Sequence, residues 1–69
     1  MNQHERIRKY IDDFGSITPM NAFVDLGITK LATRIGEMIR NGEKITKAME
    51  IGTNRYGDLV RYMRYKKVG

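Results

Sequence analysis

The chain has 69 residues, of which 41% are hydrophobic and 30% charged, so we expect one small domain over residues 1–69 with a thin core. It has no cysteine and one histidine, His4, which excludes disulfides and leaves too few ligands for a metal site. Its net charge is +5, and no apolar run approaches the roughly 18 residues of a membrane span, so we expect a cytoplasmic protein with no membrane partner.

The charges are distributed unevenly along the chain. Residues 1–28 hold three basic and four acidic side chains, a net charge of −1, whereas residues 29–69 hold ten basic and four acidic side chains, a net charge of +6. A positive field so placed attracts a polyanion. The alternative is a basic surface that serves solubility.

The first predicted helix covers residues 3–13. Its apolar face has the spacing i, i+3, i+4, i+7 and comprises Ile7, Tyr10, Ile11 and Phe14. Asn2 is placed to cap its start, and Gly15 follows its end. Residues 16–17 could then form a very short strand.

A second helix is predicted over residues 19–26, followed by a tight turn. Thr18 is a suitable N-cap, and Pro19 suits the first helical position, where no amide donor is needed. Gly27 can adopt the positive φ that ends a helix, and Thr29 can cap the next one.

The third predicted helix covers residues 30–41 and ends before Gly42. Its buried stripe is expected to be Leu31, Ile35, Met38 and Ile39. The residues expected on the opposite face are Thr29, Lys30, Thr33, Glu37 and Arg40, with Arg34 and Asn41 on its flank. These side chains are the ones free to contact a partner, and Gly36 would permit close approach of another backbone.

Beyond residue 43 the pattern favours a β-hairpin. Residues 44–51 and 59–65 are rich in strand-forming side chains, and residues 52–57 are typical of a turn. The sequence does not decide which face of the hairpin points inward, because Leu59, Met63 and Tyr65 lie on one face and Val60, Tyr62 and Val68 on the other.

Three helices followed by a hairpin describe an α+β winged helix. Over residues 3–66 the chain resembles the winged helix-turn-helix domains encoded as small free-standing proteins in bacteriophage genomes. The resemblance is carried by SITP at 16–19, LGIT at 26–29, RI at 34–35, NG at 41–42 and NRYG at 54–57. It implies that the third helix is the recognition helix and that residues 54–57 form the tip of the wing. One departure is Phe23, four residues before the turn glycine, where such units usually have a small residue.

The residue types suggest particular DNA contacts. Arg34 and Arg40 could bind guanine or phosphate in bidentate fashion. Glu37 could accept from a cytosine amino group, although an ion pair with a neighbouring arginine is the favoured interpretation. The full set of predicted contact residues is Thr29, Lys30, Thr33, Arg34, Glu37, Arg40, Lys44, Asn54, Arg55 and Tyr56.

We therefore expect a protein that binds double-stranded DNA, as a phage or prophage transcription regulator or a recombination accessory factor, with a homodimer on DNA as one arrangement. One alternative is a module that binds a host protein through Met20, Val24 or the hairpin tyrosines. A weaker alternative is binding of single-stranded nucleic acid through the pairs Arg55-Tyr56, Arg61-Tyr62 and Arg64-Tyr65. Without a cysteine nucleophile or a paired-carboxylate cleft, we expect no enzyme activity and no cofactor.

Overall fold

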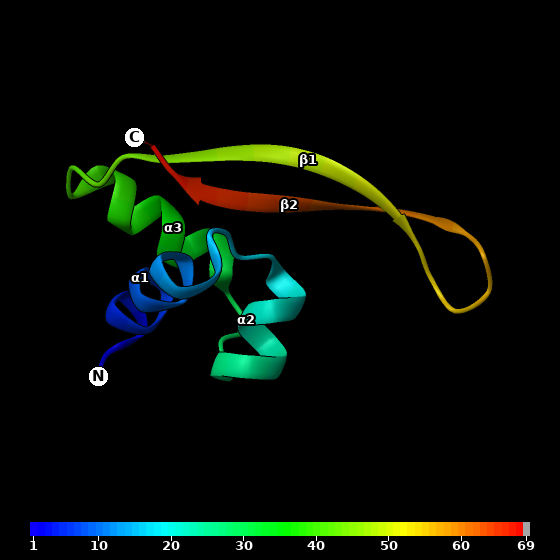
Figure 1. The fold of residues 1–69 in the computed structure, drawn as a ribbon, viewed down its shortest axis with the longest axis horizontal. Coiled ribbons are helices and arrows are strands. Elements are labelled where there is room, and N and C mark those ends of the chain that lie inside the picture. The colour runs from blue at the N-terminus through cyan, green and yellow to red at the C-terminus, as the bar shows by residue number, and fades with distance from the viewer. Residues whose placement is uncertain (69) are drawn as a thin grey trace.

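The computed structural model describes residues 1–68, which form three helices and a long two-stranded arm (Figure 1). The elements in chain order are α1 (Gln3–Phe14), α2 (Pro19–Leu26), α3 (Leu31–Arg40), β1 (Ile45–Thr53) and β2 (Leu59–Lys67). The antiparallel hairpin, residues 45–67, leaves the helices as a curved projection that we call the wing (Figure 1). The predicted α+β arrangement of three helices and a hairpin is confirmed.

Local capping explains where α1 and α2 begin and end. The Asn2 side chain accepts a hydrogen bond from the amide of Glu5, 2.8 Å away. Thr18 and Asn21 form a reciprocal capping box at the start of α2. Gly27 ends α2 with a φ of 69°, a left-handed conformation that favours glycine and lets the chain turn at once toward α3.

The start of α3 differs from the prediction. Its N-cap is Lys30 rather than Thr29, and no side chain within residues 1–68 caps it. The backbone at Lys30 has a φ of −122° and a ψ of 56°, so helical geometry begins one residue later than the sequence suggested. The amide groups of the first turn of α3 therefore have no side-chain acceptor.

All three helices and the wing contribute to one apolar core. Its buried side chains are Ile7, Ile11, Ile17, Ala22, Ile28, Leu31, Ile35, Met38 and Tyr65. Ile17 lies between α1 and α2 and forms an isolated antiparallel bridge to Tyr65, with two backbone hydrogen bonds of 2.9 Å. This bridge attaches the base of the wing to the helical body.

Two side chains expected in the core are exposed. Phe14 is 70% exposed because α1 ends at this residue, and its ring packs against that of Tyr10, with ring centroids 4.6 Å apart. Ile39 is 41% exposed, whereas Met38 is fully buried. The buried stripe of α3 is centred on Leu31, and a helical rotation of 100° per residue places Ile39 about 80° away at its edge.

The hairpin register identifies the inward face of the wing. Tyr65 pairs with Lys47 and Met63 pairs with Met49, so these side chains share one face of the sheet. Tyr65 is buried and Met63 packs against the core, so the face that carries these side chains points inward. The sequence alone had not decided between the two faces. The strands are longer than predicted and extend to Thr53 and Lys67.

Candidate nucleic-acid interface

The outward face of α3 is defined by the burial of the opposite face. With Leu31 and Met38 turned into the core, Thr33, Gly36 and Arg40 lie on the far side of the helix. A Cβ atom added to Gly36 would lie 3.7 Å from Nη1 of Arg40 and would meet no other group within 4 Å. The Arg40 side chain therefore runs back along α3 beside Gly36, with no ion-pair partner among residues 1–68.

Glu37 is turned away from this face toward α1. Nη1 of Arg34 donates to both carboxylate oxygens of Glu37 at 2.9 Å, and Nε2 of His4 lies 2.8 Å from Oε1. The hydrogen bond with His4, and next the one from Arg34, lower the pKa of Glu37. The favoured interpretation of Glu37 as an ion-pair partner of Arg34 is confirmed.

This cluster changes the expected role of Arg34. Its charge is balanced by Glu37, and its Nε is buried without a hydrogen-bond partner. Arg34 therefore sits on the flank that faces α1, in a shallow pocket shared with Asn2 and Gln3. Sequence reasoning missed His4, because it lies 33 residues from Glu37 and no local pattern joins them.

The wing tip is shaped by Asn54. Its Oδ1 accepts hydrogen bonds from the amides of Tyr56 and Asp58 at 2.9 and 3.0 Å. The amide of Gly57 donates to the carbonyl of Asn54, and Gly57 has a φ of 83°. The side-chain oxygen of Asn54 is thus used within the loop, which leaves Arg55 and Tyr56 as the exposed side chains at the tip.

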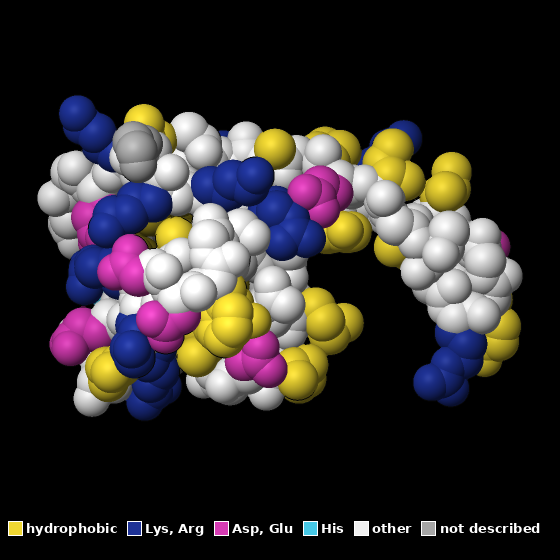
Figure 2. Space-filling view, in the orientation of Figure 1, with side chains coloured by type: hydrophobic (Ala, Val, Ile, Leu, Met, Phe, Trp, Pro, Cys, Tyr) yellow, Lys and Arg dark blue, Asp and Glu magenta, His cyan; other side chains and the backbone are white. Residues whose placement is uncertain are grey.

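Acidic side chains within residues 1–68 neutralise two of the three lysines and arginines of α1, but three of the ten that follow from Lys30 onward. Six ion pairs are formed within residues 1–68: His4–Glu37, Arg8–Glu43, Lys9–Asp13, Arg34–Glu37, Arg64–Glu50 and Lys67–Asp12. The cations of this part of the chain outside any ion pair are Arg6, Lys30, Arg40, Lys44, Lys47, Arg55, Arg61 and Lys66. All but Arg6 belong to the segment that starts at Lys30, the N-cap of α3. Figure 2 shows Lys or Arg at the tip of the wing and acids interspersed with cations on the helical body.

The alternative of stacking bases on hairpin tyrosines is not supported by their positions. Tyr65 is 4% exposed and belongs to the core. The half-buried ring of Tyr62 lies against Gly52, where an added Cβ would be 3.3 Å from the ring. Arg64 donates to Glu50 and to Ser16 at 2.8 Å. Of the three Arg-Tyr pairs, only the one at the wing tip has both members exposed.

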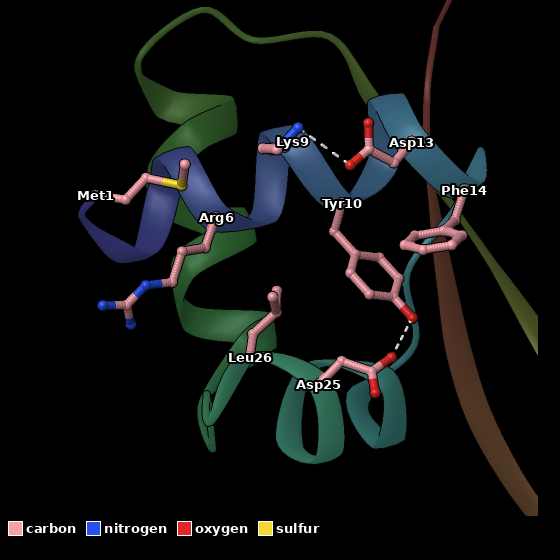
Figure 3. A pocket seen from close by; sticks show the side chains of 8 residues that line it. All are labelled: Met1, Arg6, Lys9, Tyr10, Asp13, Phe14, Asp25 and Leu26. Atoms are coloured by element: carbon pink, nitrogen blue, oxygen red, sulfur yellow. Dashed lines mark hydrogen bonds and ion pairs between the residues drawn. The ribbon is translucent and has the colours of Figure 1, made fainter.

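A pocket of about 480 Å³ lies between α1 and α2 (Figure 3). Figure 3 shows Tyr10 and Phe14 along one side and Asp25 and Leu26 along the other, with the Tyr10 hydroxyl donating to Asp25 at 2.5 Å. This bond raises the pKa of Tyr10. Lys9 and Asp13 form an ion pair at the rim of this pocket, 3.3 Å apart, whereas Arg6 makes no ion pair within residues 1–68. No set of three or more His, Cys, Asp or Glu within residues 1–68 could hold a metal.

A family model described as a winged helix-turn-helix domain matches residues 2–66. The chain belongs to this family. Membership suggests DNA as the partner and a binding rather than a catalytic role. Neither the comparison with curated proteins nor that with solved structures gave a match.

Among the described residues, no helix has both the length and the apolar character needed to cross a membrane.

Proposed function

We propose that this winged helix-turn-helix chain binds double-stranded DNA, with the outward face of α3 in the major groove and the wing tip on the adjacent backbone or minor groove. The observation that carries the proposal is the concentration of cations without ion-pair partners on α3 and the wing. Counterion release from DNA phosphates makes such cations the main source of affinity.

The start of α3 is suited to a phosphate. Its first-turn amides have no side-chain cap, and the positive end of the helix dipole favours an anion at this position. The exposed Thr29 and Lys30 flank these amides and add a hydroxyl and a charge. We assign these groups to backbone contacts that position the helix rather than to reading of bases.

Further along α3, Thr33 and Arg40 are placed to reach base edges. Both lie on the outward side, and the Arg40 guanidinium has two donors for the acceptors of guanine. Gly36 between them has no side chain to hold the groove away from the helix. Arg34 and Glu37 contribute by fixing this flank of α3 against α1, with Arg34 near the edge of the contact.

On the wing, Arg55 and Tyr56 are the side chains that we assign to the DNA backbone or minor groove. The tip is held in shape by Asn54, so its exposed side chains project from an ordered turn. Lys44 lies between α3 and β1 and adds affinity that does not depend on sequence.

The resemblance to small phage-encoded domains supports a proposal about the biological role of this chain. We propose a phage or prophage regulator of transcription, or an accessory factor in recombination, that acts on DNA in the cytoplasm of a bacterial host. Either role would require binding to duplex rather than to single strands.

The experiment is a titration of the protein with a labelled duplex and with its separated strands at two salt concentrations. The proposal expects tighter binding to the duplex and an affinity that falls steeply as salt rises. Negligible duplex binding at low salt, or equal binding to both forms, would overturn it.

A further inference from the structure

The apolar face of the wing continues beyond the helical body. Tyr65 and Met63 cover the core at the base, and the same face of the sheet carries Met49, Ile51 and Leu59 further out. These three side chains, which we call the distal wing face, are 63%, 62% and 75% exposed. Nothing within residues 1–68 covers them, although they are large apolar side chains like those that pack into the core at the base of the wing.

A second apolar face lies on α2. Met20, Phe23 and Val24 follow the helical spacing i, i+3, i+4 and are 68%, 59% and 67% exposed. We call these residues the α2 face. Figure 2 shows hydrophobic side chains on the helical body and on the wing, with an open hollow between them. Because every side chain of the two faces is more than half exposed, the faces do not cover each other within one molecule.

The charges beside the two faces are opposite in sign. The acidic side chain of α2 is Asp25, which also accepts a hydrogen bond from the Tyr10 hydroxyl, and α2 contains no lysine or arginine. Residues 45–67 contain six lysines or arginines and two acids. On the distal wing face itself, Arg61 pairs in register with Ile51 and makes no ion pair, and Asp25 follows Val24 on α2. An apolar face bordered by the Arg61 guanidinium and one bordered by the Asp25 carboxylate are complementary in charge.

We propose that the α2 face of one copy packs against the distal wing face of a second copy. A helix would then cover the sheet face beyond the point where the chain's own helices stop covering it. Soluble monomers rarely expose two apolar faces of this kind, because apolar surface in water is unfavourable. Packing the two faces together removes both from water. The contact joins unlike surfaces, and it leaves the outward face of α3 uncovered.

Two variants separate the halves of this contact. Phe23→Gln with Val24→Gln removes the α2 face and keeps good helix formers. Ile51→Thr with Leu59→Thr removes the distal wing face and keeps a β-branched residue in each strand. Because all four side chains are exposed, we expect unchanged circular dichroism spectra. Val68→Thr is the matched control, since it removes an exposed apolar side chain outside both faces.

The test is sedimentation equilibrium of the protein without DNA, so its outcome is separate from that of the DNA-binding proposal. We expect the average mass of the wild type and of Val68→Thr to rise above 8.0 kDa with concentration. Each double variant should stay at 8.0 kDa, whereas an equimolar mixture of the two should associate as pairs, because each supplies the face that the other lacks. A wild type that remains monomeric, variants that associate like the wild type, or a mixture that stays monomeric would each overturn the proposal.

Discussion

Arg34 and Glu37 lie one turn apart on α3 and are joined by two hydrogen bonds of 2.9 Å, so the acidic side chain of this helix neutralises one of its two arginines. The carboxylate also contacts His4 of α1, which holds it on the flank of the helix. Arg40 is thereby the arginine of α3 whose charge remains available to a polyanion.

Glu37→Gln is expected to tighten duplex binding several-fold at low salt, because it removes a negative charge and releases Arg34. The slope of log affinity against log salt should steepen by about 0.9 if Arg34 gains one phosphate. Fluorescence anisotropy with a labelled duplex measures both quantities. Glu43→Gln is the control, since it makes the same change of charge but releases Arg8 of α1. Weaker binding by Glu37→Gln alone would contradict this expectation and would mean that the carboxylate itself supports DNA binding, either by holding α3 against α1 or by contacting a base.

Acid should destabilise the fold through three carboxylates. A fork from Arg8, with hydrogen bonds of 2.9 and 2.7 Å, lowers the pKa of Glu43, and a hydrogen bond from Arg64 lowers the pKa of Glu50. Contact with His4, and next with Arg34, lowers the pKa of Glu37. Each folded pKa is below the ordinary value of 4.5, so the stability that these groups contribute is present above that pH and is lost as pH falls through the folded values.

Urea unfolding at a series of pH values measures this loss. Glu43→Gln should flatten the pH dependence below 4.5. At pH 7 a double-mutant cycle between Arg8 and Glu43 should give a coupling of about 0.5–1 kcal/mol, the size typical of partly exposed pairs. A pH dependence identical to that of the wild type would contradict the assignment of Glu43.

Gly36→Ala should separate stability from binding. The added methyl group meets only Nη1 of Arg40 at 3.7 Å, so we expect the helix propensity of alanine to raise the free energy of unfolding by about 0.8–1 kcal/mol. The same methyl group would obstruct the groove of DNA, so duplex affinity should fall. Urea unfolding and anisotropy on one preparation test both. A stabilised variant with unchanged affinity would show that α3 does not approach DNA closely at this residue.

Two alanine substitutions test the core boundary. Ile17→Ala should cost about 2–5 kcal/mol, because it leaves a cavity where the wing joins the helices. Phe14→Ala should cost about 1 kcal/mol or less, since the ring is mostly exposed and its aromatic partner, Tyr10, is a single ring. A large loss from Phe14→Ala in urea unfolding would contradict the exposed position of this ring.

The helices and the caps of α1 and α2 could be predicted because they depend on neighbours in sequence. Asn2, Thr18 and Gly27 act within four residues of the groups they satisfy, so local patterns located them. The exposure of Phe14 and Ile39 depends on where other elements stop covering each helix, and helical spacing alone does not contain that information.

Some contacts of the candidate site could likewise be predicted from neighbours in sequence, whereas others depend on how the elements pack. The pair of Arg34 with Glu37 was predictable from its i, i+3 spacing, whereas the contact of Glu37 with His4 required the packing of α1 on α3. The inward face of the wing followed from the burial of Tyr65, which the bridge to Ile17 attaches to the helices, because both faces of the hairpin carry apolar side chains.

The most direct test of the DNA-binding interface compares three arginines that lack an ion pair within residues 1–68, each changed to alanine and titrated with one duplex at two salt concentrations. Arg40→Ala and Arg55→Ala should each weaken binding several-fold and reduce the salt slope by about 0.9. Arg6→Ala, on α1, removes the same charge away from the outward face of α3 and the wing tip, and it should change affinity little. Equal losses for all three variants, or none for Arg40→Ala and Arg55→Ala, would contradict the assignment of α3 and the wing tip to DNA.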